Sequence, residues 1–232
     1  PNTYNIVACV GTPTQALVLR GQESYSLSQI RNGITNTDHN LAAQWLVDNK
    51  GGFTIDVNYS YDATLTIFGG TRIINKGSRK AMTWEGLDAD WAIESSSTSG
   101  SYDNHFEGFS LTAGSSNKKL FDARYIRESK FVSFRCLSGL VGMRLSSNWN
   151  LLFEDCWFKN GSNDVGSISV NFEFDGSVSY SIVNATRFTR CLFSKSETGI
   201  RAEGMGDGIH FSNCGIEGNS GYGVDFTGQA QY

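Results

Sequence analysis

Proline and charge are scarce in this sequence of 232 residues, which has 2 prolines and 18% charged residues against 26 glycines and 12% aromatics. So low a charged fraction is unusual for a helical protein. The mixture of glycine and aromatics favours many short strands joined by glycine turns. Apolar residues make up 39% of the chain, enough for a sizeable core in one large domain or two small ones.

Signals for several common functions are also missing. The sequence has no apolar run long enough to cross a membrane and no signal peptide. Its net charge is −4 and it has no basic run, which predicts no nucleic-acid partner and argues against membrane binding or insertion. The five cysteines contain no Cys-x-x-Cys pair, and no P-loop or dinucleotide-binding fingerprint is present, so we expect no metal and no cofactor.

An internal repeat is the strongest feature that is present. Four cysteines stand in similar phrases: Ser133-Phe-Arg-Cys136, Phe153-Glu-Asp-Cys156, Phe188-Thr-Arg-Cys191 and Phe211-Ser-Asn-Cys214. A second phrase follows after a glycine-rich turn: Leu120-Phe-Asp-Ala123, Gly142-Met-Arg-Leu145, Ser167-Ile-Ser-Val170, Gly199-Ile-Arg-Ala202 and Gly223-Val-Asp-Phe226. Regular alternation of two short phrases, with loops of variable length between them, is typical of a solenoid.

We therefore predict an all-β fold, a right-handed parallel β-helix of at least five stacked rungs. Short strands cannot bury an inner face alone, whereas rungs stacked about 4.8 Å apart pair each strand with its copies above and below. The four cysteines should form one inward column of free, buried thiols. Phe153, Phe188 and Phe211 should form a buried ladder, and Asp155 or Asn213 should lie at a sharp bend where Asp and Asn tolerate left-handed backbone.

The chain divides into three predicted regions. Residues 1–35 are lead-in strands and turns, residues 36–104 are a short capping helix with the first rungs, and residues 105–232 are regular rungs. The helix is expected over residues 37–50, with an apolar stripe that includes Trp45 and Leu46 and a stop at Gly51-Gly52. Such a helix would cover the end of the solenoid, whose backbone edge is otherwise unpaired.

These features resemble a known superfamily. The helix ahead of Gly51-Gly-Phe-Thr-Ile-Asp-Val57 is similar to the entry of pectate-lyase-like β-helices, and the repeated phrases are similar to their Ile-x-x-Asn-Cys-x-Phe coils. Within that superfamily, the entry segment 36–57 and the Ser/Asn/Gly-rich turns most resemble bacteriophage tailspike proteins. Tailspikes usually have a longer β-helix and a C-terminal trimerisation region, so the resemblance also implies a fragment truncated at its C-terminus.

The resemblance implies a function. Such a protein is a homotrimer at the tip of a phage tail, folded in the host cytoplasm, that binds and often depolymerises capsule or O-antigen polysaccharide of the bacterial host. We favour hydrolysis over elimination. A non-catalytic attachment or structural module is the alternative. A secreted polysaccharide lyase of bacterial origin is third, because no compact Asp-rich calcium site with a nearby base is evident.

Carboxylates supply the candidate catalytic residues. Glycoside hydrolysis needs two carboxyl groups, about 5–5.5 Å apart for retention or about 6.5–9.5 Å for inversion. Outward positions of the second phrase are expected at Asp122, Arg144, Ser169, Arg201 and Asp225. Glu173 and Asp175 open the longest loop, one rung before Glu203. We predict these three as catalytic, with Arg201 and Asp207 binding substrate; a solvated, partly salt-bridged face is the competing interpretation.

Aromatic residues are the remaining candidates. Trp149, Trp157 and Tyr180 are predicted to bind substrate by stacking on sugar rings, with Trp157 at an outward position. Core packing or a subunit interface would use the same residue types, so both alternatives stay open for each of the three.

Overall fold

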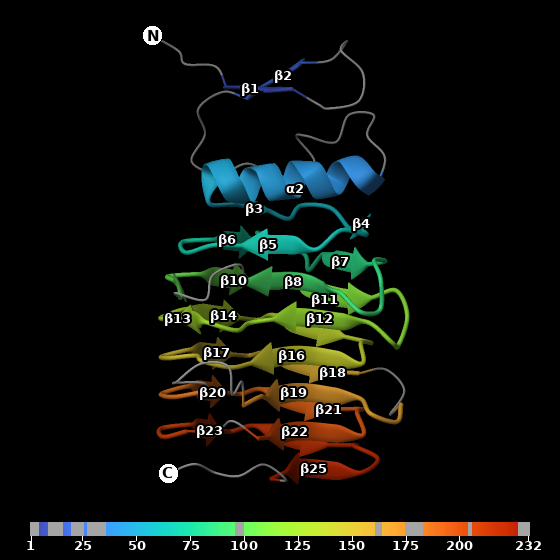
Figure 1. The fold of residues 1–232 in the computed structure, drawn as a ribbon, viewed down its shortest axis with the longest axis vertical. Helices are drawn as coiled ribbons and strands as arrows, with labels where there is room; N and C mark the ends of the chain where they lie inside the picture. The colour runs from blue at the N-terminus through green and yellow to red at the C-terminus, as the bar shows by residue number, and fades with distance from the viewer. Residues whose placement is uncertain are drawn as a thin grey trace.

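The chain is coiled into a right-handed parallel β-helix with an α-helix over one end (Figure 1). The computed structural model describes residues 5–8, 16–19, 26, 36–95, 100–160, 164–174, 183–203 and 206–226. In Figure 1 the strands nearest the viewer run from right to left and those at the back from left to right, while the chain descends from its N-terminus. That path is a right-handed coil, as the repeats predicted.

Three parallel sheets form the sides of the coil, each with seven strands. Sheet 1 contains β3 (Gly52–Thr54), β6 (Arg72–Ile74), β10 (His105–Glu107), β14 (Lys130–Val132), β17 (Leu152–Glu154), β20 (Arg187–Thr189) and β23 (His210–Ser212). Sheet 2 contains β4 (Tyr59–Tyr61), β7 (Ala81–Trp84), β11 (Ser110–Ala113), β15 (Arg135–Leu137), β18 (Trp157–Lys159), β21 (Leu192–Ser194) and β24 (Gly215–Glu217). Sheet 3 contains β5 (Leu65–Ile67), β8 (Trp91–Ser95), β12 (Lys119–Asp122), β16 (Val141–Leu145), β19 (Ile168–Phe172), β22 (Thr198–Ala202) and β25 (Tyr222–Asp225).

Two small sheets complete the described strands. β9 (Ser101–Tyr102) and β13 (Ile126–Arg127) pair in parallel between sheet 3 and sheet 1. Near the N-terminus, β1 (Asn5–Ala8) and β2 (Ala16–Leu19) pair antiparallel. No helix among the described residues is long and apolar enough to cross a membrane.

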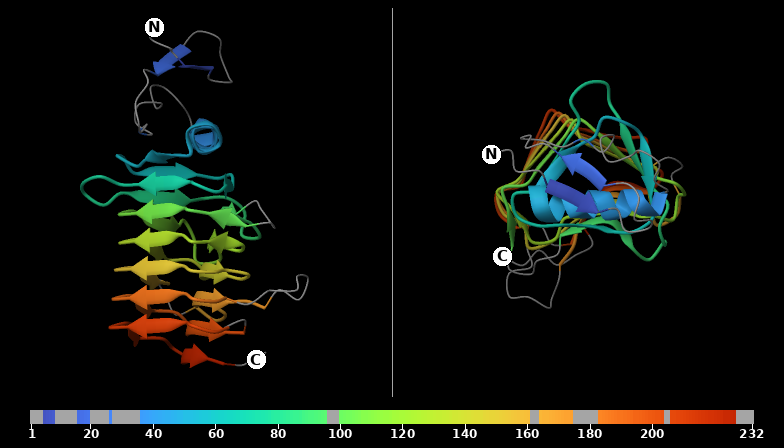
Figure 2. Two further views of the ribbon diagram at one scale, coloured as in Figure 1. Left: turned by 90° about the vertical axis from the view of Figure 1, so that its left-hand side faces the viewer. Right: turned by 90° about the horizontal axis from the view of Figure 1, so that it is seen from above.

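The helix α2 (Asn36–Lys50) lies across the N-terminal end of the coil (Figure 2). Its buried residues Ala43, Leu46 and Val47 join the core, with Trp45 partly buried beside them. The side chain of Gln44 pairs with the backbone of the edge strand β5: its Nε2 donates to Thr66 O, and its Oε1 accepts from Thr66 N, both at 2.8 Å. The helix therefore caps the solenoid as predicted, satisfying backbone groups that an edge leaves open.

Inward side chains form columns along the coil. The column of sheet 1 contains Phe106, Phe131, Phe153, Phe188 and Phe211, whose neighbouring ring centroids lie 4.5–5.0 Å apart. Phe106 to Phe188 are fully buried, but Phe211 is 39% exposed, so the prediction of full burial is wrong for this residue. Phe211 belongs to β23, the end strand of sheet 1, and therefore has a rung neighbour on one side only among the described residues.

The cysteine column is confirmed for three members and wrong for the fourth. Pairing of β18, β21 and β24 aligns Trp157, Leu192 and Gly215, which places Cys156, Cys191 and Cys214 in one column. Cys136 instead aligns with Phe158, because Phe134 occupies the position above Cys156. All four thiols are free, and three donate to carbonyls of the rung above: Cys156 to Phe131 O, Cys191 to Phe153 O and Cys214 to Phe188 O.

The predicted bend is present at each rung from β10 onward. Asp155 and Asn213 have φ of 54°, and the same corner position holds Gly108, Ser133 and Arg190, also with positive φ. A second corner, before sheet 1, holds Asp103, Glu128, Asn150, Ala185 and Gly208 in left-handed backbone. Left-handed corners turn the strand direction within one residue, which gives the coil its three-sided section (Figure 2).

The buried thiols yield a first prediction. Cys136 and Cys156 are fully buried, and burial raises the pKa of both thiols, so they should resist alkylation in the folded protein. Cys214 is only partly buried and should react first of these three. Pulse labelling with iodoacetamide followed by peptide mass spectrometry measures this. Labelling of Cys136 or Cys156 at the rate seen in guanidinium-unfolded protein would contradict the packing described.

Candidate functional site

The connection from sheet 3 to sheet 1 repeats a chemical pattern on adjacent rungs. Its three central copies are Tyr102-Asp-Asn-His105, Arg127-Glu-Ser-Lys130 and Trp149-Asn-Leu-Leu152. Parallel pairing aligns them residue by residue: Tyr102 with Arg127, Arg127 with Trp149, and His105 with Lys130. Each position of the pattern therefore becomes a column on the surface, with neighbours about 4.8 Å apart.

Buried polar residues hold this corner in place. Asn104 accepts from Thr71 N (3.0 Å) and donates to Ser101 O (3.2 Å), and its own backbone N–H donates to Ser129 Oγ (2.9 Å). Two rungs further, Asn148 donates to Ile126 O at 3.0 Å. Both asparagines are almost fully buried. Amides that pair with loop backbone in this way fix the corner, and with it the side chains displayed there.

The first column is a surface ladder in which half-buried Arg127 lies between exposed Tyr102 and Trp149. The guanidinium of Arg127 lies 5.7 Å from the ring centroid of Tyr102, and its NH1 donates to Tyr102 Oη at 2.9 Å. Trp149 is 61% exposed, and Tyr102 is 39% exposed. Exposed rings on a rigid backbone provide an apolar face with a polar edge, the arrangement on which sugar rings stack.

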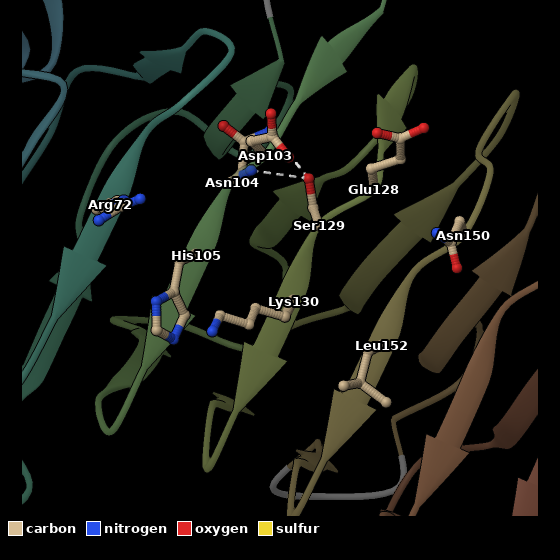
Figure 3. A pocket seen from close by; sticks show the side chains of 9 residues that line it. All are labelled: Arg72, Asp103, Asn104, His105, Glu128, Ser129, Lys130, Asn150 and Leu152. Atoms are coloured by element: carbon tan, nitrogen blue, oxygen red, sulfur yellow. Dashed lines mark hydrogen bonds between the residues drawn. The ribbon is translucent and has the colours of Figure 1, made fainter.

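Beside this ladder lies a groove of about 500 Å³ over β6, β10, β14 and β17 (Figure 3). Its volume is within the range of small-molecule sites. The lining residues are Arg72, Asp103, Asn104, His105, Glu128, Ser129, Lys130, Asn150 and Leu152. Eight of these nine side chains are polar, so the groove fits a strongly polar ligand better than an apolar one.

Charges in the groove are separated into two columns. Arg72, His105 and Lys130 align on adjacent strands of sheet 1. Asp103 and Glu128 occupy the left-handed corner position on the other side, with φ of 59° and 47°. Figure 3 shows Lys130 extending towards His105, while Asp103 and Glu128 lie away from them. Burial lowers the pKa of His105, and the positive charges of Lys130 and Arg72 lower it further. Glu107 acts in the opposite direction, but the net shift is downward, so the imidazole is neutral at neutral pH.

The predicted catalytic residues Glu173 and Glu203 lie in one column on adjacent rungs. Asn171 and Arg201 are paired on adjacent strands of sheet 3. Glu173 lies two residues after Asn171 and Glu203 two residues after Arg201, on the segment that leaves sheet 3 towards the corner. Their side chains are 34% and 38% exposed. The third predicted catalytic residue, Asp175, lies outside the described residues.

Arg201 was expected beside both glutamates, but it lies beside Glu203 only. Arg201 Nε lies 3.9 Å from Glu203 Oε1, as proposed, and equally far from Asp225 Oδ2. Glu173 pairs with Arg144 instead, at 3.2 Å between NH1 and Oε2. The register explains this, because Asn171 rather than Ser169 stands between Arg144 and Arg201. Ser169, predicted to face outward, is buried and donates to Phe158 O.

The remaining predicted binding residues are divided between two faces. Asp207 is exposed and lies at the same corner as Trp149: Ala185 N donates to Asp207 O, as Asn150 N donates to Asn184 O one rung earlier. Trp157 points outward as predicted but belongs to sheet 2, where the guanidinium of Arg135 covers its ring at 3.7 Å. Tyr180 lies outside the described residues. Trp149 and Asp207 are thus brought together at the corner, and Trp157 is not.

The rest of the outer face of sheet 3 is a salt-bridged surface. Asp122 is buried and accepts from Arg124 Nε and Arg144 Nε, each at 3.1 Å. Burial and the negative charge of Asp122 raise the pKa of neighbouring Glu94. Both guanidinium groups already bind the Asp122 carboxylate. In this part of sheet 3 the charges therefore form a salt-bridged face and not a catalytic site.

The groove itself was missed by the sequence analysis. Its residues fall in the segments of variable length between the two phrases, where repeats are hardest to align. A signal existed: each four-residue copy ends directly before a ladder phenylalanine, Phe106, Phe131 or Phe153. Aligning the sequence on these phenylalanines instead of the cysteines places the groove residues in register.

Comparison with known proteins adds evidence on the fold. No protein-family model matches the sequence, and no curated protein matches it. Among solved structures, the chain is similar to the surface adhesin PfbA of Streptococcus pneumoniae, with a TM-score of 0.57 and 11% identity over 82% of this chain and 56% of that one. It is also similar to ORF18 of Geobacillus virus E2, with a TM-score of 0.43 and 14% identity over 83% of this chain and 53% of that one.

The likeness to the adhesin agrees with the β-helix architecture. The chain spans about half the length of either structure. At 11% identity the likeness to the adhesin concerns the fold, and one fold hosts many functions, so a function must be argued from the corner site.

Proposed function

We propose that this chain is a β-helical binding module that recognises a bacterial surface polysaccharide, capsule or O-antigen, at the corner between sheet 3 and sheet 1. The observation that carries the proposal is the surface ladder of Tyr102, Arg127 and Trp149, with both rings exposed, beside a polar groove. Stacked rungs present equivalent groups at regular intervals, which suits a polymer of repeating sugars. An adhesin and a phage protein among similar structures are compatible with this role.

The biological setting is part of the proposal. A location on a phage virion tail, or outside the cell for a bacterial surface protein, would bring the corner into contact with host glycans. A homotrimeric assembly, as the tailspike resemblance implies, would display three copies of the corner and increase avidity for a repeating polymer.

Hydrolysis of the bound polysaccharide is a second candidate function. One observation favours it: Glu173 and Glu203 occupy one column on adjacent rungs, a placement from which two carboxyl groups can reach the separations that glycosidases use. Each of the two carboxyl groups also has a cation beside it, Arg144 at 3.2 Å from Glu173 and Arg201 at 3.9 Å from Glu203.

The two functions are separated by one experiment. The protein is incubated with capsule and O-antigen preparations, and binding, new reducing ends and the ultraviolet absorbance of an unsaturated product are followed. Binding without products supports the attachment module, reducing ends alone support hydrolysis, and a rise in absorbance indicates a lyase. Absence of saturable binding to every preparation would contradict the proposal.

Substituting the two glutamates gives a sharper prediction for hydrolysis. Glu173→Gln and Glu203→Gln should each lower the rate of depolymerisation at least a hundredfold, the usual order for loss of a general acid or base, while leaving binding intact. Glu217→Gln, on the exposed end strand β24 of sheet 2, is the matched control. Unchanged product formation by both variants would show that these residues are not catalytic.

A further inference from the structure

We propose that the groove binds the carboxylate of an acidic sugar, of the hexuronate class, between Arg72 and Lys130, with His105 between them. This inference rests on the proposed glycan-binding function and adds the chemical class of the ligand. Neither the predicted carboxylate site nor the aromatic ladder specifies that class.

The first argument is the state of the two cations. Arg72 and Lys130 are exposed and lie one rung on either side of His105, which separates their backbones by about 10 Å. Long side chains at that separation can converge on one anion. Within the described part of the chain, neither cation lies in an ion pair, whereas Arg124, Arg144 and Arg190 all do. Two uncompensated cations facing one groove attract a carboxylate.

The second argument is the opposite side of the groove. Asp103 and Glu128 are exposed and form no ion pair within the described residues, although Lys130 lines the same groove. Carboxylates there accept hydrogen bonds from hydroxyl groups and repel a second anion. A ligand that satisfies both columns carries one negative charge on one edge and hydroxyl donors on the other. A hexuronate has this distribution, whereas a simple anion lacks the donors and a neutral sugar lacks the charge.

The third argument is the role available to His105. Its ring is largely covered, and its Nε2 lies 2.9 Å from Glu107 Oε2. A neutral imidazole between two cations adds no repulsion between them.

The fourth argument is the limited length of the site. In the corner column, the polar residues Asp103, Glu128 and Asn150 are bounded by Gly70 on one side and Ala185 on the other. In the cation column, Leu152 follows Lys130. The complete set of groups therefore exists on few rungs, so the acidic sugar is expected at one defined position rather than along the whole coil.

Histidine signals in NMR spectra provide the test, because the chain has only 3 histidines. The whole protein is labelled on histidine, and the signals are assigned by His39→Gln, His105→Gln and His210→Gln. Sodium glucuronate, the neutral isostere glucuronamide, methyl glucoside and sodium acetate are each titrated. His210 is an internal control, because it lies in the same column, three rungs beyond Lys130.

The expected result is a saturable shift of His105 by glucuronate without a shift of His210. Glucuronamide should bind at least about tenfold more weakly, since it lacks the charge that the cations recognise. Lys130→Gln should weaken glucuronate binding by a similar factor. Arg187→Gln, an exposed cation of the same column, should leave it unchanged.

Three results would overturn the inference in distinguishable ways. Equal binding of glucuronate and glucuronamide would mean that the groove takes neutral sugars, which leaves the glycan-binding proposal standing. Equal binding of acetate would mean a simple anion site. If no ligand shifts His105, acidic-sugar binding in the groove is wrong, and glycan binding is then decided by the polysaccharide experiment alone.

Discussion

Phe188→Ala is expected to lower the free energy of unfolding by about 3–5 kcal/mol, the usual range for truncating a buried phenylalanine. The ring is fully buried and lies between Phe153 and Phe211, with centroids 4.5 Å and 5.0 Å away. Its edge also contacts Phe172 and Phe193. Removing it opens a cavity in a continuous stack, so neighbours cannot collapse into the space without leaving their own rungs.

Denaturant titration measures this loss. Phe68→Ala is the matched control, because Phe68 is 44% exposed and its truncation should change the free energy of unfolding by less than about 0.5 kcal/mol. A loss below about 1 kcal/mol for Phe188→Ala would mean that the phenylalanine column does not carry the core.

Trp149→Ala is expected to weaken polysaccharide binding at least about tenfold, because aromatic anchors dominate such interfaces. Its side chain is 61% exposed, so truncation should leave stability nearly unchanged. The readout is the dissociation constant for the polysaccharide preparation that the wild-type protein binds, measured by biolayer interferometry.

Trp157→Ala is the natural comparison. Trp157 is also an exposed tryptophan, but it lies on sheet 2 and is covered by Arg135. Its truncation should leave the affinity unchanged. If Trp157→Ala reduces binding and Trp149→Ala does not, the binding face is sheet 2 and the corner site is wrong.

Repetition made the architecture predictable from the sequence. Inward columns require apolar or small residues at fixed positions of each rung, and the phrases around Phe153, Phe188 and Phe211 show that period directly. The bend at Asp155 and Asn213 was predictable for a similar reason, since the two-residue gap before each cysteine breaks the alternation of a strand.

Register was harder, and both errors were shifts of two residues. The sequence analysis aligned Cys136 with Cys156, two positions from its true partner Phe158. It also aligned Gly142 with Ser167, two positions from Ser169, which lies opposite Gly142 in sheet 3. A shift of one residue would turn a strand inside out, but a shift of two keeps Cys136 facing inward, as its true partner Phe158 does. Hydrophobic pattern therefore does not detect it, and backbone pairing is needed to decide.

The functional site was only partly predictable for the same reason. Trp149 and Asp207 were predicted to bind substrate, but their place in one column depends on stacking of the corner across rungs. The paired cations Arg72 and Lys130 come from segments 58 residues apart, so no local motif joins them. Only the three-dimensional register places His105 between them.

A crystal structure with an oligosaccharide released from the bound polysaccharide is the most direct test of glycan recognition at the corner. The account predicts a sugar ring stacked on Trp149 or Tyr102 and further sugar density in the groove between Arg72 and Lys130. Density confined to another face, such as sheet 2 around Trp157, would contradict it.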